Sequence, residues 1–228
     1  METGDLLTRF LGQLNDLSAG LFLLCAFGMV ATRQTLGCLH LFIIQSFFFG
    51  SSSLLIGARP LAWDLLAVGI LNFITKLILI PWLLRRTVRE EVYARREIVQ
   101  VFNIPTSLLI ALALTIMAYF VSAPMLSAVN TAGYAKVNLP IGLAALLLGV
   151  YTLAVRREAV PQLIGLLAME NGAFFAGIAI VPGLSIITEL AFAFDALMLA
   201  FVMAVLTRVI HERIGTTEAG SLSSLKEE

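Results

Sequence analysis

The chain consists of long apolar runs separated by short polar segments. Seven of these runs approach or exceed the roughly 20 residues that a helix needs to cross a bilayer. They cover residues 11–31, 36–57, 61–84, 104–125, 138–155, 160–181 and 185–209. The short alternating segments typical of a membrane β-barrel are absent, and helices are the other structure that satisfies the backbone in lipid. The pattern predicts an all-α, polytopic membrane protein with about seven transmembrane helices.

Composition strengthens this prediction and removes several classes of enzyme. The chain is 59% hydrophobic and 13% charged, whereas soluble domains are about half apolar and a quarter charged. It contains no Walker loop, HExxH, GxSxG or nucleotide-binding fingerprint. Cys25 and Cys38 fall in or beside apolar runs without metal-ligand spacing, so we expect both to be small buried hydrophobes. We expect no catalytic residue, cofactor or metal in this chain.

The positions of lysine and arginine predict the orientation in the membrane. Three of them, Arg9, Arg59 and Lys136, would lie on one side, and Lys76 falls inside a span. The other eleven would share the opposite side: Arg33, Arg85, Arg86, Arg89, Arg95, Arg96, Arg156, Arg157, Arg208, Arg213 and Lys226. Because cytoplasmic loops carry the excess of positive charge, we place the N-terminus outside and the C-terminus in the cytoplasm. The expected location is the inner (cytoplasmic) membrane, with no cleaved signal peptide.

The longest polar connection is RRTVREEVYARREIVQ, residues 85–100. Its Arg86–Glu90 and Glu91–Arg95 pairs have the i,i+4 spacing that supports an isolated helix. We expect it to extend the third span into water. One interpretation is a solvated charged helix, and the other is a docking face for a cytoplasmic partner.

Three ionisable residues are predicted at mid-depth on three different spans: Lys76 on the third, Glu170 on the sixth and Asp195 on the seventh. Glu189 and Asp64 lie nearer the outer ends of their helices. A carboxylate near the bilayer centre costs about 2.5–3.5 kcal/mol on insertion scales, and such groups face the bundle interior or a water-filled cavity and pair. We therefore expect Lys76 to offset one carboxylate and the other to take up and release a proton.

Other interpretations of these polar residues stay open. One alternative is a static ion pair that fixes helix register. Asn72, one turn before Lys76, has two interpretations: a hydrogen bond to the ammonium or to a water in the ion path, or a polar contact between helices. His40 is expected to be a hydrogen-bonded interior residue.

Small residues recur at helical spacing around Glu170. Ala173 and Gly177 form one stripe, and Ala168, Gly172 and Ala176 form another. Small residues let neighbouring helices approach closely in membranes. We expect the sixth span to be central in the bundle.

The segments RRE…IGLLAMENG and GTTEAGSLSSLK, together with FITKLILIPWLL nearer the N-terminus, carry a resemblance to a known family. Over residues 142–226, and in overall length and helix plan, the chain resembles hydrogenase-4 component E, a membrane subunit of formate hydrogenlyase and related nickel–iron hydrogenase complexes. That family is itself similar to the three-helix subunit K of respiratory complex I. The resemblance implies four regions: 1–103, an N-terminal three-helix half with a cytoplasmic helical extension; 104–137, a connecting transmembrane helix and outer loop; 138–212, a subunit K-like unit; and 213–228, a cytoplasmic tail.

The resemblance also implies partners and a role. The partners would be antiporter-like membrane subunits, a membrane protein like the H component of complex I, and a peripheral hydrogenase-type module. Iron–sulfur clusters and a nickel–iron centre would reside in those partners. The arm would move protons or sodium ions. Subunit K has a carboxylate on each of its last two helices; Asp195 matches the second, but Leu167 stands at the first. Glu170 follows one turn later, about 4.5 Å along the axis and on nearly the same face.

Three functions are compatible with the sequence. The first is a non-catalytic subunit of a complex I-like hydrogenase assembly that contributes intramembrane carboxylates to ion translocation. The second is a subunit of a multi-subunit cation/proton antiporter without a redox module. The third is a structural spacer whose buried charges serve assembly alone.

Overall fold

The computed structural model describes residues 2–58, 63–87, 98, 101–128 and 136–180, with residues 193, 195–197, 199–201, 203, 204, 207 and 208. The helices are α1 (Glu2–Ala31), α2 (Thr35–Gly57), α3 (Trp63–Asn72), the π-helix η1 (Phe73–Leu79), α4 (Ile80–Thr87), α6 (Ile104–Ala128), α7 (Asn138–Val155) and α8 (Ala159–Ile180). No strand occurs among the described residues. The predicted all-α fold is confirmed.

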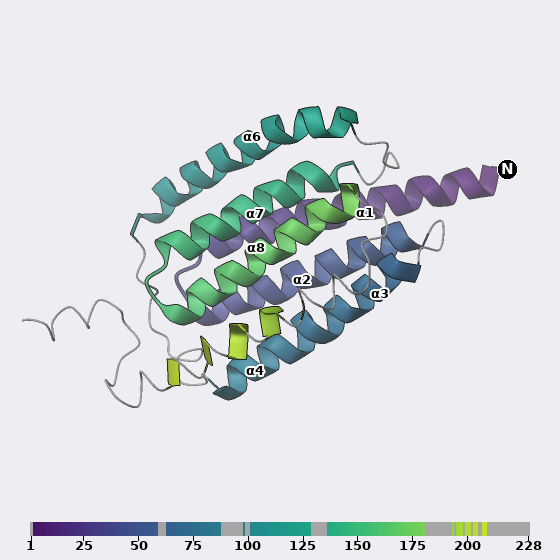
Figure 1. Ribbon diagram of the computed structural model, residues 1–228. Helices are drawn as coiled ribbons and strands as arrows, with labels where there is room; N and C mark the ends of the chain where they lie inside the picture. The colour runs from purple at the N-terminus through teal and green to yellow at the C-terminus, as the bar shows by residue number, and fades with distance from the viewer. Residues whose placement is uncertain are drawn as a thin grey trace, which may run out of the picture.

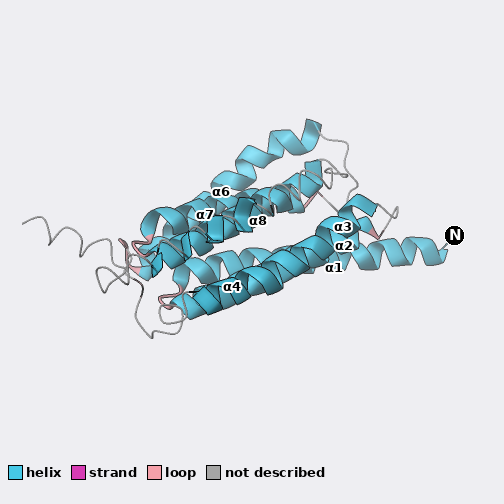
Figure 2. Ribbon diagram, turned by 60° about the horizontal axis from the view of Figure 1, so that its bottom comes forward, coloured by secondary structure: helices cyan, strands magenta, loops and turns pink. Residues whose placement is uncertain are grey.

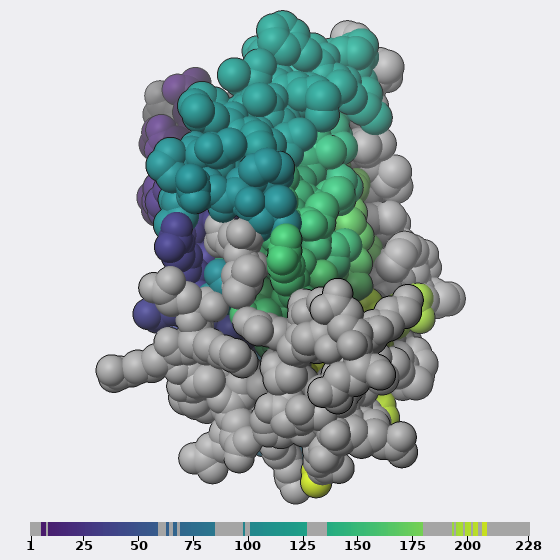
Figure 3. Space-filling view, turned by 90° about the vertical axis from the view of Figure 1, so that its left-hand side faces the viewer, coloured from purple at the N-terminus to yellow at the C-terminus, as the bar shows by residue number. Residues whose placement is uncertain are grey.

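The helices form a bundle in which α1, α2 and α3–η1–α4 lie side by side and face α6, α7 and α8 (Figures 1 and 2). The two groups meet where α1 packs on α7 and where α2 packs on α8. Helix α6 packs on α7 at the edge, and Figure 3 shows it lying across one side of the bundle. Helix α8 is the most deeply buried of the five long apolar helices, as expected for the sixth predicted span.

Five helices within the described part of the chain are long and apolar enough to cross a membrane. They contain residues 9–31, 35–57, 104–126, 138–155 and 159–179. These match the first, second, fourth, fifth and sixth predicted spans. The third predicted span is divided into α3, η1 and α4. The seventh lies largely outside the described residues, and those of its residues that are described are helical.

Helix α1 is longer than predicted. It begins at Glu2 rather than near residue 11, and its N-terminal end projects beyond the other helices (Figure 1). Leu6 and Phe10 on this projection are exposed. The expected start followed the apolar run, but a helix can continue past the apolar region because its hydrogen bonds are all internal.

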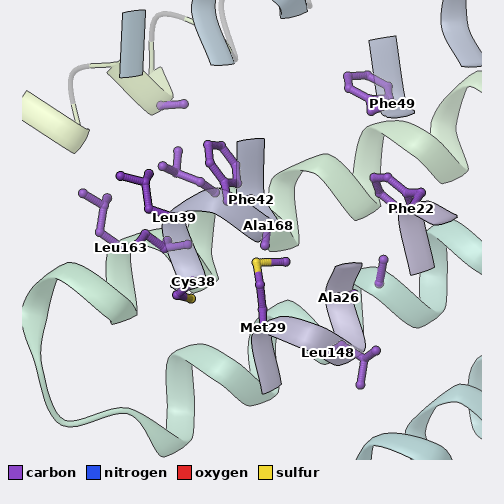
Figure 4. Close-up of a cluster of buried hydrophobic side chains, with 14 of the residues drawn as sticks. Phe22, Ala26, Met29, Cys38, Leu39, Phe42, Phe49, Leu148, Leu163 and Ala168 are labelled. Carbon is purple, nitrogen blue, oxygen red and sulfur yellow. The ribbon is translucent and has the colours of Figure 1, made fainter. Parts of the chain in front are cut away.

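The core fills the space between the two groups of helices. Figure 4 shows side chains from α1, α2, α7 and α8 directed toward one another: Phe22, Ala26, Met29, Cys38, Leu39, Phe42, Phe49, Leu148, Leu163 and Ala168. The rings of Phe22 and Phe175 stack with centroids 4.2 Å apart, which is a favourable aromatic separation. Cys25 and Cys38 are buried and free, as expected. His40, expected in the interior, is instead exposed on α2, because the buried face of this helix passes through Cys38 and Leu39.

The turn after α7 buries Arg156, which was expected in a cytoplasmic loop. The side chain is only 2% exposed. Its Nη2 donates to the carbonyl oxygens of Met29 at 2.6 Å and Thr32 at 2.8 Å, at the C-terminal end of α1. The last carbonyls of a helix lack internal partners, so the guanidinium caps α1. Burial lowers the pKa of Arg156 from its ordinary value, but an arginine remains protonated in proteins.

Replacing Arg156 with methionine is expected to lower the free energy of unfolding by about 3 kcal/mol, because hydrogen bonds to a charged group contribute about 1.5–3 kcal/mol. The measurement is denaturant unfolding of the purified chain in bicelles. Arg157→Met is the matched control because Arg157 is exposed. Equal effects of the two changes would contradict the capping role.

Candidate functional site

An ion pair between two helices forms the centre of the site. Lys76 Nζ, on η1, lies 3.2 Å from Glu170 Oε1, on α8. The lysine side chain is fully buried and the glutamate side chain is 16% exposed. The lysine charge is therefore removed from water and the glutamate charge largely so, and each offsets part of the desolvation of the other. Of the two acids predicted at mid-depth, Glu170 is the partner of Lys76.

The π-helix η1 positions Lys76. The backbone N–H of Ile80 donates to the carbonyl of Thr75, five residues earlier, instead of four as in an α-helix. Pro81 follows at once, and in a regular α-helix its ring would clash with the carbonyl of Leu77. The wider turn avoids this clash. Segments of π-helix occur frequently at functional sites, and nothing in the apolar pattern predicted one here.

Two aromatic rings complete the surroundings of the ammonium. Lys76 Nζ lies 5.1 Å from the ring centroid of Phe174, on α8, and 5.8 Å from that of Phe49, on α2. A cation within about 6 Å of a ring face gains roughly 0.5–2 kcal/mol. The lysine is thus held by α2 and α8 together.

Glu170 also borders a cavity of about 460 Å³ on its other side. Asp195 lines the same cavity, with Leu167, Phe174 and Leu199 among the apolar residues. The two carboxylates predicted at similar depth therefore share one space. Leu167 and Glu170 both face it, as the i,i+3 shift along α8 predicted.

A cluster of amides lies beside the pair on the α2 side. Asn72 Nδ2 donates to the carbonyl oxygen of Ser46 at 2.7 Å. Asn171, next to Glu170 in the sequence, donates from Nδ2 to Ser46 Oγ at 2.9 Å and lies 3.4 Å from Gln45 Oε1. All four side chains are fully buried. Asn72 therefore contacts α2, and the structure does not place its amide against the ammonium of Lys76.

The remaining predicted residues fall wholly or partly outside the described part of the chain. Asp64 lies on α3 with its side chain outside the described residues, and Glu189 lies outside them entirely. The connection 85–100 also lies outside the described residues, with two exceptions. The backbone of residues 85–87 forms the end of α4, and Ile98 is described. Within the part of the chain that the structure covers, no group of three His, Cys, Asp or Glu residues is placed to hold a metal ion.

A second buried polar cluster was missed from the sequence. Ser52 Oγ donates to Asn15 Oδ1 at 2.6 Å, Asn15 Nδ2 donates to Asn138 Oδ1 at 2.9 Å, and Asn138 Nδ2 donates to Ser52 Oγ at 2.8 Å. The ring of bonds joins α1, α2 and α7. Each of these residues is a polar interruption of an apolar run. Because such side chains form hydrogen bonds between membrane helices, they were the signal that could have predicted this cluster.

Comparisons with known proteins find relatives over nearly the whole chain. It is 30% identical over 213 residues to Rv0085, an uncharacterised protein of Mycobacterium tuberculosis, covering 93% of this chain and 96% of the relative. The chain belongs to the family of Rv0085. It is also 27% identical over 221 residues to hydrogenase-4 component E of Escherichia coli K12, covering 91% of this chain and 95% of the relative. The same values hold for hydrogenase-4 component E of Shigella flexneri.

This family member is therefore a distant homologue of hydrogenase-4 component E, in agreement with the resemblance seen in its sequence. No family model matches the chain, and no solved structure matches it.

Proposed function

We propose that the chain is a non-catalytic membrane subunit of a hydrogenase-type complex. The homology to hydrogenase-4 component E over most of the chain supports this role, as do the apolar helices. Its neighbours would be antiporter-like membrane proteins and one like the H component of complex I, and the redox centres would lie in a peripheral module. The similarity of residues 138–212 to complex I subunit K is part of the proposal.

Within that complex, Glu170 is the central group of a path for protons or sodium ions. The observation that carries this proposal is the position of Glu170 between Lys76 at 3.2 Å and a cavity that also holds Asp195. The charge of Lys76 offsets part of the cost of burying the Glu170 carboxylate, and Asp195, the second carboxyl group on the cavity, would carry the incoming proton. When the proton moves to Glu170, its attraction for Lys76 is lost. Protonation of Glu170 on the cavity is in this way coupled to the charge of Lys76 in the interior of the bundle.

The test is proton uptake by membrane vesicles that contain the assembled complex. Glu170→Gln keeps the shape of the side chain and removes its ionisation, so we expect coupled proton movement to fall at least about tenfold per complex, as for loss of a positioned acid–base group. Asp16→Asn, an exposed carboxylate of α1, is the matched control and should change nothing. Pumping that survives Glu170→Gln would refute the ion path.

The same experiment separates the alternative functions. If the buried charges serve assembly alone, Glu170→Gln and Asp195→Asn lower the yield of complex but leave the activity of each complex unchanged. If the chain belongs to a cation/proton antiporter, it co-purifies with antiporter-type subunits and without a hydrogenase-type module. Identification of the proteins that co-purify with the tagged chain in gentle detergent decides between the hydrogenase-type and antiporter-type assemblies.

A further inference from the structure

The amide cluster beside Lys76 contains buried polar atoms without protein partners. Among the described residues, Gln45 Nε2, Asn72 Oδ1 and Asn171 Oδ1 are buried and make no hydrogen bond. Each such atom costs about 1–3 kcal/mol when nothing satisfies it. These three atoms come from α2, α3 and α8, and all three residues are fully buried. Unpartnered atoms from three helices, in residues that are linked by hydrogen bonds around Ser46, indicate a bound group that completes them.

The hydrogen bonds already present bring these atoms together. Asn72 donates to the carbonyl of Ser46, and Asn171 donates to the hydroxyl of the same residue. Gln45 precedes Ser46 and approaches Asn171 through Oε1 at 3.4 Å. The amides of Asn72 and Asn171 each donate to Ser46, and the amide of Gln45 accepts from Asn171. The other end of each amide has no partner. Turning the Asn72 amide over would set its Oδ1 against the carbonyl oxygen of Ser46, two acceptors with no proton between them. Nδ2 is therefore the donor there, and Oδ1 is the atom without a partner.

The donor and acceptor types identify the bound group. Gln45 offers N–H donors, whereas Asn72 and Asn171 offer carbonyl acceptors. A water molecule accepts one hydrogen bond and donates two in this arrangement, and buried waters make about three such bonds. A metal cation suits the two carbonyls but is repelled by the N–H groups of Gln45 and by the nearby ammonium of Lys76.

We propose that Gln45, Asn72 and Asn171 bind at least one ordered water, which reaches Lys76 from the α2 side of the ion pair. Asn72 lies one turn before Lys76, and Asn171 follows Glu170 directly, so the water site adjoins both members of the ion pair. An ammonium has three N–H donors, and the contact with Glu170 leaves a donor for water. A role of this water in proton transfer rests on the proposed function, whereas the binding of the water does not.

In the relay, written in the direction from the amide cluster to the cavity and therefore opposite to the step from Asp195 above, Lys76 passes a proton to the Glu170 carboxylate and becomes a neutral amine. The amine then takes a proton from the bound water, which regains one from the next water in line. No oxidant or further reactant is needed. The ion pair thereby connects a polar interior route to the cavity that holds Asp195.

The binding test uses the full chain in lipid bilayers, labelled with ¹⁵N at lysine and glutamine, and solid-state NMR transfer from water protons. The chain has only three lysines, Lys76, Lys136 and Lys226, and Lys76→Met assigns the buried signal. We expect water transfer to both Gln45 Nε2 and Lys76 Nζ in the unaltered chain. Absence of transfer to Gln45 overturns the site without any variant.

Asn171→Leu tests the side from which water reaches the lysine. We expect transfer to Lys76 to fall at least about fivefold, because loss of a polar partner empties a buried water site. Asn138→Leu is the matched control, since Asn138 is a buried amide whose bonds are made to Asn15 and Ser52. An unchanged Lys76 signal in Asn171→Leu overturns the proposal, because water would then arrive through the cavity.

The relay role is measured separately in the assembled complex. If Glu170→Gln stops pumping while Asn171→Leu leaves it unchanged, the relay is wrong and the proposed function stands. If neither change affects pumping but Gln45 contacts water, the proposed ion path fails and the water site stands.

Discussion

Replacing Lys76 with methionine is expected to lower the free energy of unfolding by about 3–5 kcal/mol, because it leaves a buried carboxylate without its partner. The double change Lys76→Met with Glu170→Gln should recover most of that loss. A buried ion pair replaced by neutral groups of similar size is often nearly neutral for stability. Unfolding in bicelles by denaturant, with all four combinations of the two sites, gives the coupling free energy of the pair.

Lys136→Met is the control for this cycle, since Lys136 is exposed and an exposed charge contributes little. Two outcomes would count against the pair. A double variant as unstable as Lys76→Met would mean that the lysine acts through other contacts, such as the rings of Phe49 and Phe174. A coupling free energy near zero would mean that Lys76 and Glu170 do not hold each other in the folded protein.

This cycle also separates stability from function. The double variant retains the fold if the pair is replaceable, yet it has no proton-carrying group at either position. A stable complex that no longer moves protons would show that the charges are retained for transport. A stable complex with full transport would leave the pair without a functional role.

The lengths of the apolar runs were enough to locate most helices. The predicted spans 36–57 and 138–155 correspond to α2 (Thr35–Gly57) and α7 (Asn138–Val155) almost residue for residue. This agreement has a physical cause, because a backbone in lipid must be helical wherever its side chains are apolar. The same argument does not fix where a helix ends outside the apolar region, which explains the early start of α1.

The apolar pattern was much less informative about the site. It predicted that Lys76, Glu170 and Asp195 lie at similar depth, but depth alone does not select between two acids. The choice of Glu170 depends on the rotation of each helix about its axis, and the π-helix before Pro81 changes that rotation. In a run that is apolar all round, no hydrophobic face reveals the rotation.

The amide cluster illustrates the same limit. Gln45, Asn72 and Asn171 come from three separate runs, and each alone is an ordinary polar interruption of a membrane helix. Only the packing of α2 against both α3 and α8 brings them together around Ser46. The small residues on α8 were a more direct signal: Gly172 and Ala176 contact α7 as expected, whereas Ala173 lines the cavity instead.

The contact between α7 and α8 leads to the second large prediction. A Cβ added to Gly172 would overlap the backbone nitrogen of Leu146, and one added to Gly142 would overlap that of Ala176. Backbone atoms cannot turn aside as a flexible side chain can, so the helices must separate. Gly172→Ala is expected to lower the free energy of unfolding by about 3 kcal/mol, the upper part of the range for overpacking. Denaturant unfolding in bicelles measures it.

Gly20→Ala is the matched control, because a Cβ at Gly20, also within a long helix, meets nothing within 4 Å. There the change should be neutral or stabilising by up to about 1 kcal/mol, since alanine is the better helix former. Because the two changes are expected to have opposite signs, they distinguish the effect of close contact between α7 and α8 from the effect of helix propensity. Loss of stability at both positions would contradict the explanation.

Because Gly172 follows Glu170 and Asn171 on α8, separation of α7 from α8 also moves the ion pair. We therefore expect any Gly172→Ala protein that folds to show a weaker coupling between Lys76 and Glu170.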